Sequence, residues 1–196
     1  MNAYDAIMTR RSTRKFKPDM VEPEKIQKII EAGRYAPSGG NSQTNHFFVV
    51  QKPEVLQKLI SMVEAAFAKM EVREDTYQSL KTAILLSKKG GFAFTYHAPV
   101  LIFIANRKDY DNNMADVAVA LENMMVAAND LDLGTCYNNQ LRWLNEEPDL
   151  LAYLHELGMK ENERVYGGLV LGYPATPDGL PNRKHLDRKG NEVTFI

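Results

Sequence analysis

The chain has 196 residues, of which 44% are hydrophobic and 25% are charged, and its formal net charge at pH 7 is −1. This length predicts one domain over residues 1–196 with a full hydrophobic core. The balanced charge argues against general affinity for nucleic acid or an anionic membrane. The single cysteine excludes an internal disulfide and a thiolate-rich metal site. Because neither a secretory signal nor a bilayer-length apolar run is visible, we expect a soluble cytoplasmic protein.

Apolar periodicity and helix-start signals organise the N-terminal part of the chain. Glu22-Pro23 is typical of a helix start, because proline fits the first turn, and apolar residues follow at helical spacing up to Tyr35. The pattern predicts helices over 2–9, 23–35 and 53–70, with a buried strand over 47–51.

The segment 71–96 carries the weakest pattern. Its apolar residues predict a helix that ends near Gly90-Gly91, followed by three aromatic residues, Phe92, Phe94 and Tyr96, which are consistent with core packing after the end of a helix. Downstream, the pattern predicts strands over 100–105, 134–138 and 165–171 and helices over 113–132 and 148–157. With no repeat or low-complexity linker, nothing marks a domain boundary.

The predicted helix over 113–132 is apolar on nearly every side. Such a helix must be covered all round, so it lies either at the centre of one domain or in a subunit interface. Its many alanines, among them Ala115 and Ala118, would let a second helix approach closely. The last four residues, 193–196, are also apolar and follow a polar tail, which suggests an extra strand added to a sheet edge.

The basic stretch 10–17 carries five positive charges and no acidic residue. Cations this close together repel one another, and a bound anion would relieve the repulsion. Because the cluster is local and the chain as a whole is not basic, we expect one small anionic ligand rather than a polymer.

A second polar stretch, residues 36–43, reads APSGGNSQ and leads directly into a predicted buried strand. Its residue types leave backbone N–H groups free and supply hydroxyl and amide groups. Two interpretations stay open on composition alone. One is an ordinary helix-to-strand turn, and the other is a rigid loop that lines a polar, planar ligand.

Several common sites are excluded by motif. The sequence has no Rossmann glycine pattern after a strand, no P-loop, no zinc-protease helix and no nucleophile elbow. The four histidines are scattered, so we predict no metal site. The remaining polar residues include no obvious nucleophile or base, which is typical of a protein whose cofactor supplies the chemistry.

These motifs together resemble the nitroreductase family of flavin enzymes. The match rests on Arg10, Ser12, Arg14 and Phe16, followed by Pro37, Ser38, Asn41 and Gln43. The resemblance implies an α+β fold with a central, mostly antiparallel β-sheet flanked by helices, assembled as an intertwined homodimer. It also implies a single FMN-binding domain, with NAD(P)H as the electron donor and segment 71–96 as a variable lid over the substrate.

Carried onto this sequence, the resemblance implies separate tasks for the site residues. Arg10 would hold the FMN phosphate with Ser12 beside it and Arg11 within reach, Arg14 would face the pyrimidine edge, and Arg183, or else Lys184, would return to the phosphate. The loop residues would line the ring from the other subunit, and a third segment would pass its N5 side. The expected cofactor-binding residues are Arg10, Arg11, Ser12, Arg14, Pro37, Ser38, Gly39, Asn41, Gln43, Cys136, Tyr137, Asn138 and Arg183.

Two functions follow from this resemblance. In the first, NAD(P)H reduces bound FMN, which then reduces a nitroaromatic, a quinone or a similar electrophile by a ping-pong mechanism. In the second, the chain is a flavin-binding protein for storage, sensing or other flavin chemistry, without efficient turnover. No catalytic side chain is assigned in either. We expect Cys136 to be a small apolar residue rather than a redox thiol, because it has no resolving partner.

Overall fold

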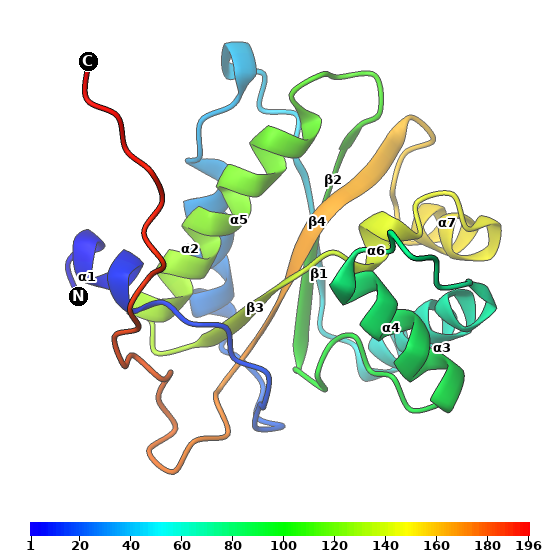
Figure 1. Ribbon diagram of the computed structural model, residues 1–196, viewed down its shortest axis with the longest axis horizontal. Coiled ribbons are helices and arrows are strands. Elements are labelled where there is room, and N and C mark those ends of the chain that lie inside the picture. Colours follow the sequence, from blue (N-terminus) through cyan, green and yellow to red (C-terminus); the bar gives the residue numbers. More distant parts are fainter.

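The computed structural model describes all 196 residues and is built around one four-stranded sheet. The strands are β1 (His46–Val50), β2 (Val100–Arg107), β3 (Gly134–Asn138) and β4 (Glu163–Gly172). Their order across the sheet is β1-β2-β4-β3, and every neighbouring pair is antiparallel. The α+β fold and its antiparallel sheet are therefore confirmed (Figure 1).

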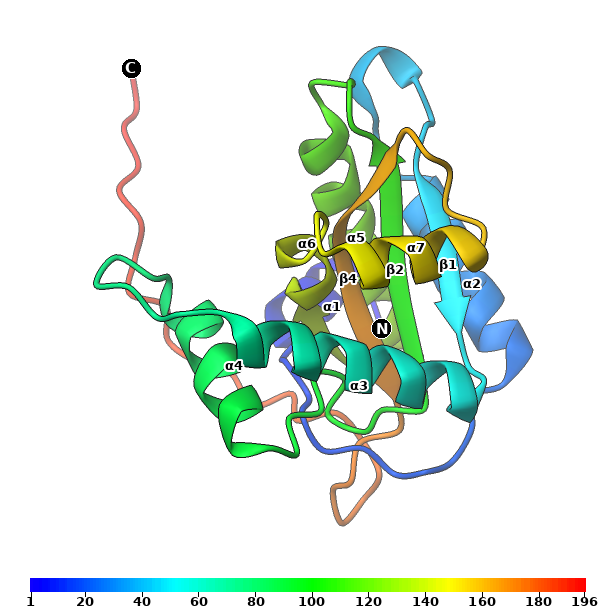
Figure 2. The ribbon, with the colours of Figure 1, turned by 90° about the vertical axis from the view of Figure 1, so that its right-hand side faces the viewer.

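Helices cover both faces of this sheet (Figures 1 and 2). The helices α2 and α5 pack on one face, with α1 beside α5, while the others pack on the opposite face. The helices are α1 (Ala3–Thr9), α2 (Pro23–Arg34), α3 (Pro53–Lys69), α4 (Gln78–Lys89), α5 (Asn113–Asp130), α6 (Gln140–Trp143) and α7 (Pro148–Glu156), and a short 3-10 turn, η1, spans Gly39–Asn41.

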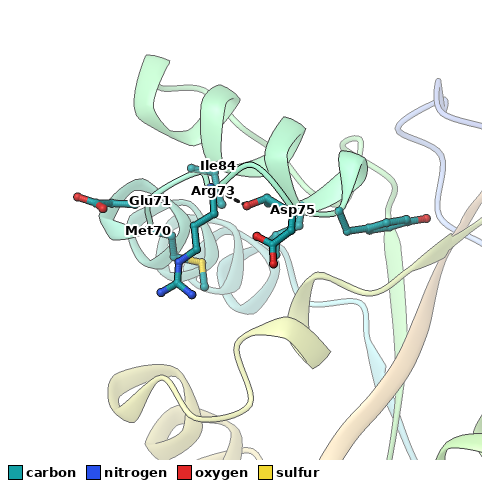
Figure 3. A pocket seen from close by; sticks show the side chains of 8 residues that line it. Met70, Glu71, Arg73, Asp75 and Ile84 are labelled. Atoms are coloured by element: carbon teal, nitrogen blue, oxygen red, sulfur yellow. Dashed lines mark hydrogen bonds between the residues drawn. The ribbon is translucent and has the colours of Figure 1, made fainter.

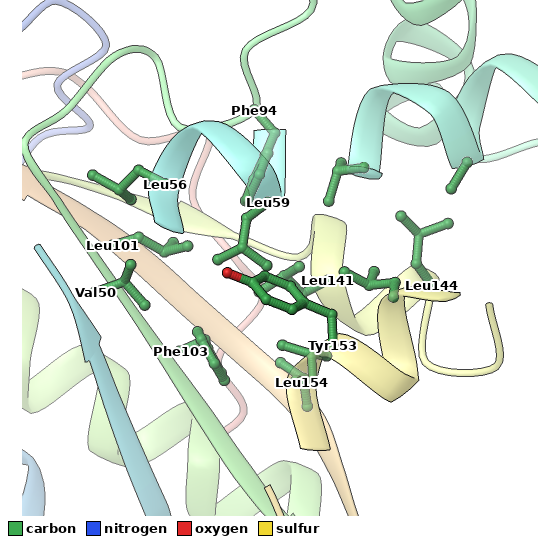
Figure 4. Close-up of a cluster of buried hydrophobic side chains, with 14 of the residues drawn as sticks. Val50, Leu56, Leu59, Phe94, Leu101, Phe103, Leu141, Leu144, Tyr153 and Leu154 are labelled. Atoms are coloured by element: carbon green, nitrogen blue, oxygen red, sulfur yellow. The ribbon is translucent and has the colours of Figure 1, made fainter. Parts of the chain in front are cut away.

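Strand β2 is buried on both of its faces, which explains the continuous apolar run at its start. Alternate side chains point to opposite faces of a strand. Val100, Ile102 and Ile104 accordingly join the core under α2 and α5, whereas Leu101 and Phe103 join the core under α3 and α7. Figure 4 shows the second of these cores, with the ring of Tyr153 among leucine side chains. Both faces are buried between Val100 and Ala105, which favours an apolar residue at every position of that stretch.

Most predicted elements are present, with ends displaced by one or two residues. The predicted helix over 113–132 ends at Asp130, and the strand predicted over 165–171 extends to 163–172. The short α6 was not predicted. The terminal residues 193–196 form no strand within the chain, and Phe195 is 93% exposed.

Helix α5 is only half covered in a single chain. Its inner side, including Val117, Leu121 and Met124, is fully buried. Its outer side leaves Met114 49% exposed and Val119 40% exposed. The neighbouring α1 adds further exposed apolar side chains, namely Tyr4, Ile7 and Met8. We refer to these five exposed side chains as the α1–α5 face.

Candidate functional site

The basic segment is held along β3 and β4 by backbone pairing. Thr13 donates its N–H to the Thr135 carbonyl at 2.8 Å, and Lys17 donates to the Tyr173 carbonyl at 2.8 Å. Ser12 also forms an isolated parallel bridge with Thr135. These contacts place the N-terminal cations beside the segment 135–138, so two groups of predicted site residues meet.

Arg14, Cys136 and Tyr96 form the centre of this cluster. The guanidinium carbon of Arg14 lies 5.9 Å from the Tyr96 ring centre. The pKa of Arg14 is raised, first by the negative charge that Cys136 carries when ionised and then by the Tyr96 hydroxyl, although partial burial opposes both. Burial raises the pKa of the Cys136 thiol, outweighing the opposing influence of Arg14 and Ser12. Cys136 is a buried free cysteine, and its role as a small apolar residue rather than a redox thiol stays a prediction.

Tyr96 was not predicted as a site residue. It has a φ of +52°, and the next residue, His97, has a φ of +56°. Such left-handed conformations cost about 1–3 kcal/mol in residues other than glycine, and they cluster at functional sites. Here the turn brings the Tyr96 ring against Arg14. The only sequence signal was the aromatic run that ends at Tyr96, which was equally consistent with core packing.

Arg10 and Arg183 both contact the C-terminal half of α5 or the residues just after it. Arg183 Nε donates to Asn129 Oδ1 at 3.2 Å, and its Nη2 lies 2.8 Å from Asp132 Oδ1. Asn129 in turn donates its amide to the Ala6 carbonyl at 3.0 Å, in the last turn before Arg10. Arg10 Nε lies 3.4 Å from Glu122 Oε1, yet it is buried and makes no hydrogen bond.

The remaining members of this group differ in what they offer a ligand. Arg11 Nη1 donates to the Lys184 carbonyl at 2.7 Å, which ties the C-terminal segment to the basic stretch. Tyr137 is 40% exposed. Asn138 is buried, and its amide donates to the Phe94 carbonyl at 2.8 Å. That bond makes Asn138 an anchor for the segment before Tyr96. We call Arg10, Ser12, Arg14, Cys136 and Arg183 the basic half-site.

The polar loop forms a second, separate group. Ser38 Oγ accepts the backbone N–H of Gln43 at 3.0 Å, and the Gln43 side chain donates to Asn41 Oδ1 at 3.0 Å. Gly39 donates its N–H to Asp116 Oδ1 at 3.1 Å, which fixes the loop to the first turn of α5. Pro37, Asn41 and Gln43 remain exposed. We call residues 37–43 the loop half-site.

The two half-sites lie far apart in one chain. The loop half-site precedes β1, at one edge of the sheet, whereas Cys136 lies on β3, at the opposite edge. Three strand spacings of about 4.8 Å separate those edges. Figures 1 and 2 both show η1 at one end of the molecule and the basic stretch at the other. A single protomer therefore does not bring all the predicted residues to one ligand.

An open hollow of about 630 Å³ lies between the end of α3 and α4. Figure 3 shows the side chains around it, with Arg73 and Asp75 on the connecting segment and Ile84 on α4. Beside it, Tyr77 meets the indole of Trp143 edge-on, with ring centres 6.2 Å apart. This is the segment that the resemblance assigns to a lid, and its role stays a prediction.

No helix of the protein is both long and apolar enough to cross a bilayer.

The antiparallel sheet, its two helical layers and its cation-rich half-site define a class of α+β protein suited to an anionic cofactor. The chain belongs to the nitroreductase family, whose model matches residues 7–173. A solved structure from Bacteroides fragilis, a nitroreductase with bound FMN, has a TM-score of 0.86 to this chain. It is 32% identical, and the match covers 100% of this chain and 99% of that one.

Curated relatives carry more than one activity in their names. A protein of Archaeoglobus fulgidus, provisionally named NADH dehydrogenase/NAD(P)H nitroreductase, is 33% identical over 86% of this chain and 83% of its own length. The iodotyrosine deiodinase of Haliscomenobacter hydrossis is 25% identical over 98% of this chain and 88% of its own length. The names of these relatives therefore point to different electron acceptors, and fold alone does not select one for this chain.

Proposed function

We propose that the protein is an FMN-dependent oxidoreductase in which NAD(P)H is the electron donor and a nitroaromatic, quinone or similar electrophile is the acceptor. The observation that carries the proposal is the basic half-site, where Arg10, Ser12 and Arg14 are fixed beside Cys136 by backbone pairing with β3. The similarity to an FMN-bound nitroreductase supports the choice of cofactor.

The residues present fit FMN chemically. A phosphate needs about two cations or several N–H donors, and guanidinium groups bind it well because they present paired donors. Arg10 Nε is buried and makes no hydrogen bond within the chain, although the Glu122 carboxylate lies 3.4 Å away. Arg14 keeps its positive charge, because a guanidinium stays protonated at neutral pH, and would face the pyrimidine edge of the ring. Bound FMN would supply the ability to accept and donate a hydride.

The site is complete, on this proposal, only in a homodimer. The loop half-site of one protomer would line the ring held by the basic half-site of its partner, because one chain keeps the two apart. The α1–α5 face supplies an exposed apolar surface for such an interface. The terminal residues 193–196 are exposed and apolar, and β1 is an edge strand, so the tail of one protomer would add a strand beside β1 of the other.

The chain offers no dinucleotide-binding motif apart from the flavin site, so donor and acceptor would use one place in turn. Arg14 would hold positive charge where negative charge develops during reduction, which lowers the barrier electrostatically. Sharing one place predicts ping-pong kinetics, with parallel double-reciprocal plots and inhibition by excess of either substrate.

Flavin content and anaerobic reduction test the proposal. The purified protein is expected to absorb in the flavin bands, and heat is expected to release FMN. Addition of NADH or NADPH without oxygen is then expected to bleach the flavin within seconds. A protein that binds no flavin would overturn the whole proposal. A yellow protein that neither nucleotide bleaches over minutes would instead favour the flavin-binding role without turnover.

A further inference from the structure

The loop half-site is held by a small polar network at the start of α5. Ser42 donates its hydroxyl to the Tyr110 oxygen at 2.9 Å, and Tyr110 donates to Asp116 Oδ2 at 2.9 Å. The other carboxylate oxygen accepts the Gly39 N–H at 3.1 Å. Asp116 is only 5% exposed, so its carboxylate is largely removed from water and depends on these donors.

The loop also needs external support, because its backbone is unusual. Gly40, Asn41 and Gln43 have φ values of +58°, +54° and +48°. The left-handed conformation is energetically unfavourable for Asn41 and Gln43, because neither is glycine. Such conformations persist only where surrounding contacts determine them. A Cβ on Gly39 would lie 2.7 Å from the Tyr110 hydroxyl, so the loop backbone packs directly on this network.

The network faces away from the groups that a ligand would meet. Pro37, Asn41 and Gln43 are exposed, while Asp116 is buried beneath the loop. The Asn45 amide adds a bond from the following segment to the Asp116 carbonyl at 3.2 Å. Asp116 and Tyr110 therefore shape the loop without occupying its ligand-facing side.

We propose that Asp116 and Tyr110 are positioning residues, which hold the loop half-site in its binding conformation before the cofactor arrives. This role rests on the proposed FMN function. When a ligand binds only one conformation, its apparent Kd equals the intrinsic Kd divided by the fraction of protein already in that conformation. Loss of the network lowers that fraction, so it weakens FMN binding without changing the contacts in the fully loaded protein.

The test compares Tyr110→Phe and Asp116→Asn with a matched control, Tyr153→Phe. Tyr153 is also a mostly buried tyrosine, but it lies in the other core. We expect the Kd for FMN, measured by flavin fluorescence quenching, to rise about tenfold in each network variant, which is about 1.4 kcal/mol. The control is expected to keep the wild-type Kd. At saturating FMN, the visible spectrum and kcat of both network variants are expected to match wild type.

Two results would overturn the role. The first is a wild-type Kd in both network variants. The second is a changed flavin spectrum at saturation, which would mean that these side chains contact the flavin or alter its surroundings directly.

Amide hydrogen exchange tests the same role without any flavin, so it separates this proposal from the proposed function. The N–H groups of Gly39, Asn41, Ser42 and Gln43 are all hydrogen-bonded in the chain. A peptide spanning 36–45 is therefore expected to exchange slowly in the flavin-free protein and at least tenfold faster in Asp116→Asn. Equal exchange in the two proteins would refute the positioning role even if FMN binds. The milder Tyr110→Phe serves if Asp116→Asn fails to fold.

Discussion

Mixing two inactive variants tests whether each flavin site takes its two half-sites from different protomers. The first variant, Arg10→Ala with Arg14→Met, removes two cations from the basic half-site. Hydrogen bonds to charged groups are worth roughly 1.5–3 kcal/mol each, so the pair costs at least about 3 kcal/mol, or more than a hundredfold in Kd. The second variant, Gly39→Val, damages the loop, because its Cβ would lie 2.7 Å from the Tyr110 hydroxyl, which Ser42 and Asp116 hold in place.

The expected recovery follows from symmetry. Random pairing of equal amounts makes about half of the dimers mixed, and each mixed dimer has one site with both defects and one intact site, so about a quarter of all sites should bind FMN. The variants are unfolded together, refolded, and assayed for bound flavin by absorbance, with each variant refolded alone as the control. A mixture that binds no more FMN than the two controls would refute shared sites. Purified mixed dimers with two tags should hold one FMN each.

Three further predictions follow from the site and the core. Arg14→Met should slow anaerobic reduction by NAD(P)H about ten- to hundredfold, the equivalent of about 1.4–2.7 kcal/mol in the barrier; stopped-flow reduction at the wild-type rate would contradict the role of Arg14. Cys136 should react with iodoacetamide at pH 7 at least about tenfold more slowly in the native protein than after unfolding, because burial raises its pKa; rapid native labelling would contradict this. Burial acts to raise the pKa of Glu163, but His46, 2.9 Å away, and the Lys160 N–H outweigh it, so that this pKa lies below its ordinary value. The unfolded state therefore binds the proton more readily, and the stabilisation is present above about pH 4.5 and lost as the pH falls through the folded-state pKa. Glu163→Gln should flatten the dependence of the unfolding free energy on pH between about 5 and 3, and an unchanged slope in denaturant titrations would contradict the assignment.

Local patterns predicted the helices and strands because the spacing of apolar residues in each element follows which of its sides are buried. Strand β2 is apolar at every position between Val100 and Ile104, and both faces of that strand are in fact covered. Helix α3 shows helical spacing from Leu56 to Phe67, and those residues form its buried side. The four-residue α6 was missed because it is too short to show a period.

The motifs also predicted which segments carry the basic half-site, but not the residues that support it. Tyr96 lies against Arg14 because Tyr96 and His97 both adopt left-handed backbone conformations. The pattern of side chains in the sequence does not predict such conformations. Asp116 looks like an ordinary acidic residue in the first turn of a helix, where negative charge is favourable. Its partner Gly39 is 77 positions earlier in the chain, so only the folded structure reveals that the carboxylate supports the loop.

Helix α5 separates the two half-sites within one chain. Each motif was recognised from its own local sequence, but that sequence does not show how far apart the two lie. The first turn of α5 holds the loop half-site through Asp116, and its last turn holds Arg183 through Asn129. Asn129 lies 13 positions after Asp116, which is about 20 Å along a helix that rises 1.5 Å per residue. The same helix leaves Met114 and Val119 exposed on its outer side. A two-fold axis perpendicular to α5 on that side would set two copies of the helix antiparallel, so that the first turn of one lies near the last turn of the other. The length of α5 would then match the separation between the half-sites, and the interface that covers its apolar side would be the same one that completes both sites.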